Sequence, residues 1–174
     1  MINTLLIQNS KLKLALWISF LFGAGSLISG KIIQHFYHVK PCALCIYQQI
    51  ALGAIGFFGL IALITWRKSY HTIIAVIVLA LVAINFGIAT YHVGVEQHIF
   101  PVMSQCHGNL GPHHTGVEAL RDLLLETNVV PCDKVKWSFL GLSMASYNML
   151  LSAIVLLFWI GVLKSRRKFK TEGF

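Results

Sequence analysis

Charged side chains are scarce in this chain, and their scarcity excludes an ordinary soluble domain. Only 11% of the 174 residues are Asp, Glu, Lys or Arg, whereas a soluble domain carries about 25%. Among the charged residues the acidic ones are fewer, with 6 Asp and Glu against 14 Lys and Arg, which gives a net charge of +8. The basic residues cluster between apolar runs, so the positive charge suits anchoring at a membrane surface and argues against binding of nucleic acid.

Four long windows contain no charged residue: 14–30, 41–66, 69–95 and 137–163. A helix needs roughly 17–25 apolar residues to span a bilayer, so the windows predict four transmembrane helices, at about 14–31, 42–65, 72–91 and 140–163. Helices are expected and sheet is not, because backbone polar groups in lipid must be satisfied within the chain. The first window also resembles a signal peptide, but the later windows predict a polytopic protein in either case.

The predicted fold is all-α: one integral membrane domain over residues 1–174, built as a bundle of four transmembrane helices. Lys and Arg are concentrated in both termini and the 65–71 turn, and the positive-inside rule places these segments in the cytoplasm. The outer loops are then about 32–41 and 92–139. In the longer loop, Thr115-Gly116-Val117-Glu118 has the pattern of a capping box. A short amphipathic helix on the membrane surface is expected there.

All four cysteines lie in segments predicted to face outward, where disulfides persist. Cys42 and Cys45 form a Cys-x-x-Cys pair directly before an apolar run. A helix that begins near Pro41 would place both sulfurs on one face. The partial positive charge of a helix N-terminus favours a thiolate there. The pair by itself is compatible with redox chemistry, with a structural disulfide or with half a zinc site.

The other two cysteines, Cys106 and Cys132, lie in the long outer loop. Four cysteines allow three pairings; pairing Cys42 with Cys45 is natural for a vicinal pair and leaves Cys106 with Cys132. Two disulfides on adjacent outward segments suggest thiol–disulfide exchange in series. The electrons need an acceptor, and the sequence has no haem or flavin motif. Cys45 lies at a depth that a lipid-soluble two-electron acceptor can reach, and a membrane quinone meets that requirement.

Polar side chains also interrupt the apolar runs. Gln48 and Gln49 follow Cys45 by one turn, and Gln49 falls on the helix face of the cysteines. An amide at membrane depth is costly without a partner, so it bonds either a neighbouring helix or a small molecule beside the cysteines. Asn85 is expected to bond across helices. His92 is either an interfacial histidine or a ligand for a polar head group near Cys45.

The ordered set of motifs resembles the disulfide bond formation protein B (DsbB) family of bacterial inner-membrane thiol oxidases over nearly the whole chain. The set comprises Pro41-Cys42-Ala43-Leu44-Cys45, Tyr91-His92-Val93-Gly94-Val95-Glu96, the spacing of Cys106 and Cys132, and Trp137-Ser138-Phe139-Leu140-Gly141-Leu142-Ser143-Met144. The resemblance implies a protein-dithiol:quinone oxidoreductase with cytoplasmic termini and periplasmic cysteines, which sustains disulfide formation in secreted proteins. We expect a monomer that holds no metal ion and binds no nucleic acid.

The resemblance also implies a role for each cysteine. A periplasmic DsbA-type oxidase of the thioredoxin fold attacks the loop disulfide and forms a mixed disulfide with Cys106. Cys132 then attacks the Cys42–Cys45 pair. Cys45, with His92 near the quinone, reduces ubiquinone, or menaquinone when oxygen is scarce. One departure is Gln49, because the family commonly has an arginine there that helps bind and polarise the quinone.

Three alternatives stand beside this interpretation. The first is a metal-handling membrane protein, because cysteine and outward histidines, including His107, His113 and His114, suit zinc or copper. The second is a non-catalytic membrane protein with two structural disulfides. The third is a specialised family member that serves one dedicated partner.

Overall fold

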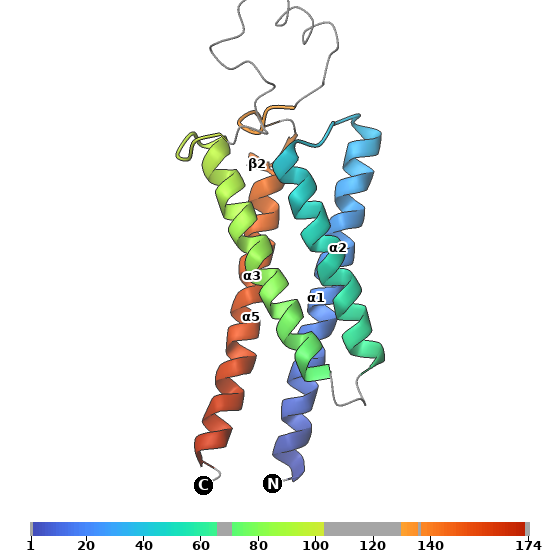
Figure 1. The fold of residues 1–174 in the computed structure, drawn as a ribbon, viewed down its shortest axis with the longest axis vertical. Helices are drawn as coiled ribbons and strands as arrows, with labels where there is room; N and C mark the ends of the chain where they lie inside the picture. Colours follow the sequence, from blue (N-terminus) through green and yellow to red (C-terminus); the bar gives the residue numbers. More distant parts are fainter. Residues whose placement is uncertain (1, 66–70, 103–129, 136, 173–174) are drawn as a thin grey trace, which may run out of the picture.

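Four long helices build the protein, and the computed structural model describes residues 2–65, 71–102, 130–135 and 137–172. The helices are α1 (Ile2–Phe36), α2 (Ala43–Ile64), α3 (His71–Glu96) and α5 (Met144–Glu172), and they lie side by side as a bundle (Figure 1). Each contains a stretch long and apolar enough to cross a membrane. The prediction of an all-α bundle with four candidate membrane spans is confirmed.

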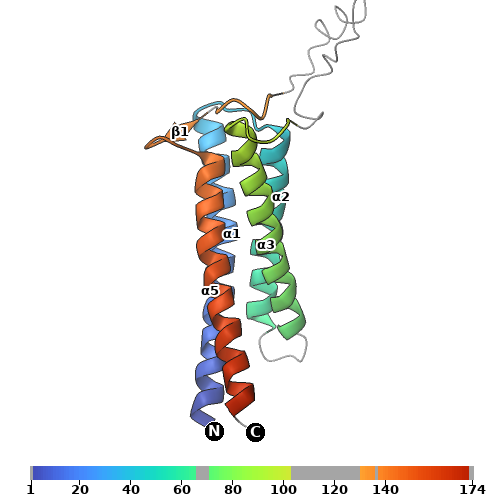
Figure 2. The ribbon, with the colours of Figure 1, turned by 90° about the vertical axis from the view of Figure 1, so that its left-hand side faces the viewer.

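The start of α1 and the end of α5 lie at one end of the bundle, and α2 begins at the other end (Figures 1 and 2). The 35-residue α1 is about 52 Å long at 1.5 Å per residue, which exceeds a hydrocarbon core of about 30 Å. Part of α1 therefore lies outside the apolar layer. We expected this helix over 14–31, but no proline interrupts the sequence between Ile2 and Phe36. The surface helix expected in the long outer loop lies outside the described residues.

A two-residue hairpin precedes α5, whose sequence-based start was near residue 140. Strand β1 (Ser138–Phe139) pairs antiparallel with β2 (Leu142–Ser143). Leu140 and Gly141 both have positive φ, 49° and 79°, as in the type I′ turns that close two-residue hairpins. The helix therefore begins at Met144. Neither strand lies in a candidate span, so the sheet does not place unpaired backbone in lipid.

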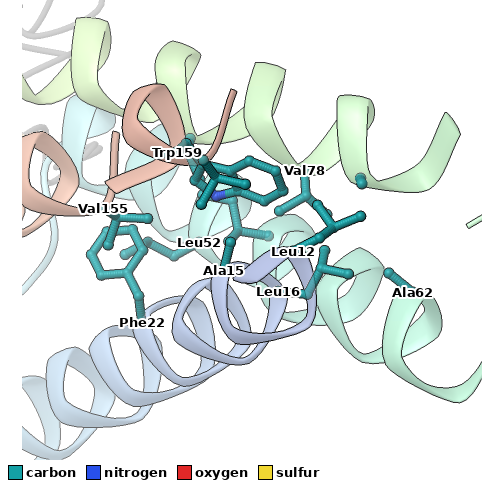
Figure 3. Close-up of a cluster of buried hydrophobic side chains, with 13 residues drawn as sticks. Leu12, Ala15, Leu16, Phe22, Leu52, Ala62, Val78, Val155 and Trp159 are labelled. Carbon is teal, nitrogen blue, oxygen red and sulfur yellow. The ribbon is translucent and has the colours of Figure 1, made fainter. Parts of the chain in front are cut away.

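Buried apolar side chains from all four helices meet inside the bundle (Figure 3). Trp159 of α5 donates a hydrogen bond from Nε1 to Ser19 Oγ of α1, at 2.9 Å. The Ser19 hydroxyl in turn donates to the Ala15 carbonyl oxygen, at 2.8 Å. A buried indole N–H needs such a partner, so this contact also fixes the rotation of α5 against α1.

Helices α1 and α2 approach closely at Gly23. A Cβ at this position would lie 2.6 Å from the backbone nitrogen of Gly56 and 2.7 Å from the Leu52 carbonyl oxygen. Because these are backbone atoms, no side-chain movement could make room for it. Close backbone approach at small residues is a common device for joining helices in lipid, where apolar burial gives no drive for association.

Candidate functional site

The cysteine pair lies at the N-terminus of α2. Cys42 is the N-cap residue, with φ −77° and ψ 173°, and its Sγ accepts a hydrogen bond from the Cys45 backbone N–H at 3.4 Å. The two Sγ atoms lie 3.0 Å apart, and both residues are free thiols. Cys42 is 5% exposed and Cys45 is half-buried. The two sulfurs thus share one face, as the spacing predicts, although the helix begins one residue after Cys42.

The pKa of Cys42 is lowered from 9.0 to about 4. The largest cause is the hydrogen bond with the Cys45 side chain, and a hydrogen bond with His92 adds to it. Burial acts in the opposite direction, because it penalises the charged form. At neutral pH Cys42 is therefore a thiolate in the reduced protein.

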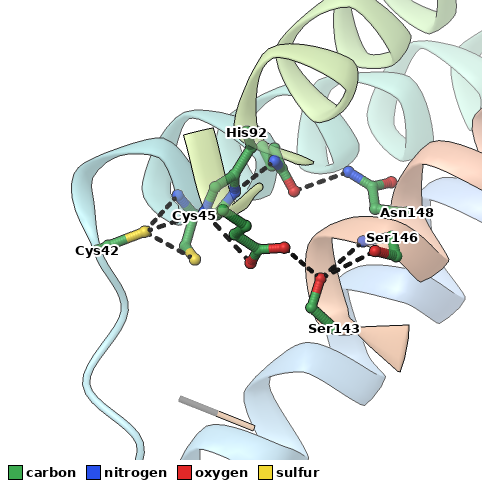
Figure 4. A network of polar contacts seen from close by, with 8 residues as sticks. Cys42, Cys45, His92, Ser143, Ser146 and Asn148 are labelled. Carbon is green, nitrogen blue, oxygen red and sulfur yellow. Dashed lines mark hydrogen bonds and ion pairs between the residues drawn. The ribbon is translucent and has the colours of Figure 1, made fainter. Parts of the chain in front are cut away.

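His92 of α3 lies directly beside Cys42 (Figure 4), with Nε2 3.7 Å from the Cys42 Sγ. Its other ring nitrogen, Nδ1, lies 2.9 Å from Nε2 of Gln48. The Glu96 carboxylate, one turn further along α3, approaches Nε2 to 3.8 Å. The ring is buried. His92 is therefore held between two helices by partners on both nitrogens.

The N-terminus of α5 is joined to this cluster through Ser143. Its Oγ accepts a hydrogen bond from the Ser146 backbone N–H at 3.1 Å, which is the bond of an N-cap residue. The same hydroxyl donates to Glu96 Oε2. Two sequence motifs that are distant along the chain, the end of α3 and the segment before α5, thus meet beside the cysteine pair (Figure 4).

The chain folds back over α3 directly after the helix. Phe100 stacks on Tyr91 with ring centroids 5.6 Å apart and planes 10° apart, and the Tyr91 hydroxyl donates to the Pro101 carbonyl oxygen at 2.9 Å. A Cβ on Gly94 would overlap Cδ2 and Cε2 of the Phe100 ring. Gly94 is therefore required for this turn, which brings Val102 against the cysteine cluster.

Cys132 reaches the same place from the long loop. It is 1% exposed and packs in one cluster with Cys42, Leu44 and Val95. It takes part in a disulfide. The structure thus places Cys132 in the same buried cluster as Cys42. Cys106 lies outside the described residues, and so do His107, His113 and His114.

The two glutamines of α2 have different surroundings. Sequence reasoning singled out Gln49, but the buried amide that contacts His92 is Gln48. Gln48 also accepts a hydrogen bond from Asn148 Nδ2 at 2.9 Å. Gln49 is half-buried, and within the described part of the chain its side chain makes no hydrogen bond. Three and four residues after Cys45 are both on its face, so sequence spacing cannot choose between them.

Several polar residues of the site carried no sequence signal of their own. Glu96, Ser143 and Asn148 stood inside or beside recognised motifs, without an assigned contact. Asn85 was expected to bond across helices, and this is confirmed, because its Nδ2 donates to Asn148 Oδ1 at 3.1 Å and to Ser152 Oγ at 2.8 Å. The sequence feature that could have pointed to Asn148, as it did to Asn85, is a polar residue within an apolar run.

The sulfur geometry favours thiol chemistry over metal binding. Ligand atoms of Cys42, Cys45 and His92 lie within 4.8 Å of one another, close enough to share a metal ion. Two thiolates on a tetrahedral zinc, with Zn–S bonds of about 2.3 Å, would stand about 3.8 Å apart. The observed separation is 3.0 Å. The two sulfurs are therefore closer together than two zinc ligands would be, as expected of thiols placed to form a disulfide.

The bundle and the site define a polytopic membrane protein with a vicinal thiol pair at a helix N-terminus. Residues 12–162 match the model of the family described as disulfide bond formation protein DsbB. The chain belongs to the disulfide bond formation protein B family.

Two relatives that carry the family name agree with this assignment. The chain is 33% identical over 139 residues to the disulfide bond formation protein B of Xylella fastidiosa strain 9a5c, covering 75% of this chain and 77% of that protein. It is 31% identical over 156 residues to that of Dechloromonas aromatica, covering 83% and 88%. An uncharacterized protein of Rickettsia prowazekii is 26% identical over 134 residues, covering 76% and 77%.

Proposed function

We propose that this protein is a dithiol:quinone oxidoreductase that reoxidises a DsbA-type periplasmic oxidase. The observation that carries the proposal is the cluster that joins the half-buried Cys45, the buried Cys42 and the disulfide-bonded Cys132. These three cysteines lie together at the start of a membrane span. Family membership supports the same function.

The first half of the reaction takes place in the outer loop. A thiolate of the reduced partner attacks Cys106 in the Cys106–Cys132 disulfide, forms a mixed disulfide and releases Cys132 as a thiolate. Cys132 then attacks Cys42, the pair sulfur that shares its buried cluster, and the Cys42–Cys45 bond breaks with its electrons on Cys45. The second thiolate of the partner attacks the mixed disulfide, which leaves the partner oxidised and Cys106 as a thiolate.

The second half restores the protein. Cys106 attacks Cys132 in the Cys132–Cys42 bond, reforms the loop disulfide and expels Cys42 as a thiolate. Its pKa of about 4 makes Cys42 a good leaving group, because thiols of lower pKa leave faster. Closure of the Cys42–Cys45 disulfide then releases the two electrons taken from the partner.

The residues beside Cys45 fit a quinone. A bound quinone accepts two electrons and two protons. Cys45 is the more exposed residue of the pair. Gln49 lies one turn further along α2, and its amide makes no hydrogen bond with a described residue. Such an amide can donate a hydrogen bond to a carbonyl oxygen. Both residues lie on one face of a span, so a lipid-soluble acceptor can reach them. The role of His92 at the quinone stays a prediction.

Quinone reduction by the detergent-purified protein, with a reduced DsbA-type dithiol as donor, tests the proposal. Cys45→Ser and Cys106→Ser should each abolish turnover, because each removes one disulfide of the series. Thr90→Ala is the matched control, since this exposed hydroxyl of α3 bonds only to the Phe86 carbonyl of its own helix. Full activity in Cys106→Ser would refute the serial route, and an inactive wild type supplied with quinone and lipid would refute the enzyme assignment.

A further inference from the structure

A chain of polar side chains runs through the bundle and ends at the cysteine pair. Its members are Ser152, Asn85, Asn148, Gln48 and His92, and none is more than 8% exposed. They come from α5, α3 and α2, so the chain crosses three helices. Polar groups at membrane depth are costly and mark function. Which group donates in each of their hydrogen bonds can be worked out one residue at a time, starting from Ser152, the residue furthest from the cysteines.

The deep end is fixed by a backbone carbonyl. The Ser152 Oγ lies 2.6 Å from the carbonyl oxygen of Asn148. A carbonyl oxygen can only accept, so the hydroxyl hydrogen points to it. Asn85 must then present its nitrogen to Ser152, at 2.8 Å, and the same nitrogen donates to Asn148 Oδ1 at 3.1 Å. The orientation of the first amide is thereby determined.

Each later orientation follows from the one before it. With Oδ1 toward Asn85, Asn148 presents Nδ2 to the Gln48 Oε1, at 2.9 Å. Gln48 then presents Nε2 to His92 Nδ1, at 2.9 Å. Because that nitrogen receives a hydrogen bond, it carries no hydrogen itself. The hydrogen of a neutral ring is therefore on Nε2, which faces Cys42 Sγ at 3.7 Å and Glu96 Oε1 at 3.8 Å.

We infer that Gln48 and Asn148 are positioning residues that hold His92 in its Nε2-protonated tautomer, so that the ring donates to the Cys42 sulfur. The inference concerns the site of the proposed function, and it deepens that function by assigning a donor to the thiolate that Cys106 expels. The groups that face Cys42 are the Cys45 thiol from α2, and His92 with Glu96 behind it from α3. Without this series of hydrogen bonds, the ring is free to present the lone pair of Nε2 to the Cys42 thiolate and repel it.

The tautomer can be observed directly. We would label histidine with ¹⁵N in reduced protein in detergent, free of quinone and donor, and measure the two ring nitrogen shifts of His92, assigned with His92→Phe. The expected result is a hydrogen on Nε2 and none on Nδ1. A wild-type ring protonated on Nδ1 would overturn the inference, whatever the variants do.

Asn148→Asp tests the donor and acceptor directions of these hydrogen bonds. An ionised carboxylate only accepts, so in that state of the variant the Gln48 amide should turn its nitrogen toward residue 148 and its oxygen toward His92. The ring hydrogen should then move to Nδ1. The pH midpoint of Cys42 thiolate formation, followed by ultraviolet absorbance, should rise by about one unit, a tenfold change. Gln48→Leu should give a mixture of tautomers, because it supplies no partner.

A structural role alone would not give these results. Ser19→Ala is the matched control, since it removes a buried hydroxyl from the same bundle that takes no part in the hydrogen bonds from Ser152 to His92. It should leave the shifts and the midpoint unchanged, even if it lowers stability. Persistence of Nε2 protonation in folded Asn148→Asp, at a pH at which the introduced carboxyl is ionised, would refute the inference. Because no turnover is measured, an inactive protein with the expected tautomer would refute the proposed function and leave this inference standing.

Discussion

The thiolate of Cys42 should make the reduction potential of the cysteine pair depend on pH in an unusual way. An ordinary dithiol takes up two protons with its two electrons at neutral pH. Here the pKa of Cys42 is lowered to about 4, so the thiolate is present above that pH and is lost as the pH falls through it. Near neutrality the reduced pair therefore takes up only one proton.

The magnitude follows from the ratio of the two protonation states. A thiol with the usual pKa of 9.0 is about 1% thiolate at pH 7, whereas a pKa of about 4 makes thiolate about a thousandfold more abundant than thiol. The reduced state gains roughly three factors of ten in stability. For a two-electron couple, this raises the reduction potential by about 90 mV above that of an unperturbed pair. The pair is thereby a stronger oxidant.

The assay is equilibration of the pair with glutathione or dithiothreitol buffers between pH 5 and 8. The protein should carry Cys106→Ser and Cys132→Ser, so that only Cys42 and Cys45 respond. The potential should fall by about 30 mV per pH unit, and by about 59 mV per unit below pH 4. A slope near 59 mV per unit throughout the neutral range would refute the thiolate and the leaving-group argument built on it.

Three further predictions concern single residues. Gly94→Val should expel Phe100 from its place over α3 and lower turnover at least tenfold. Gly87→Ala in the same helix is the control and should leave turnover unchanged, because a Cβ there meets nothing within 4 Å. Equal turnover in the two variants would contradict the contact between Gly94 and Phe100. Ser143→Ala removes a helix cap and the bond to α3, and should lower the free energy of unfolding in a denaturing-detergent titration by about 1–2 kcal/mol. Gln49→Arg should lower the Michaelis constant for quinone, and an unchanged constant would count against a quinone contact at this position.

The transmembrane helices could be predicted because their signal is local. A charge in lipid costs several kcal/mol, so four windows without charge suffice to indicate four spans, whatever packs against them. The position of Cys42 and Cys45 on one helix face is equally local, since it depends only on their spacing and on the start of α2. The family resemblance added the roles of the cysteines, which no local rule contains.

Contacts between segments had to come from the tertiary structure. The rotation of each helix about its axis decides which side chains it buries, and that rotation depends on close approaches such as Gly23 against Gly56. It buries Gln48 against His92 and leaves Gln49 half-exposed, although both follow Cys45 by about one turn. Sequence spacing determined that an amide stands beside the cysteines. Only packing among three helices decided which one, and joined it to Asn148.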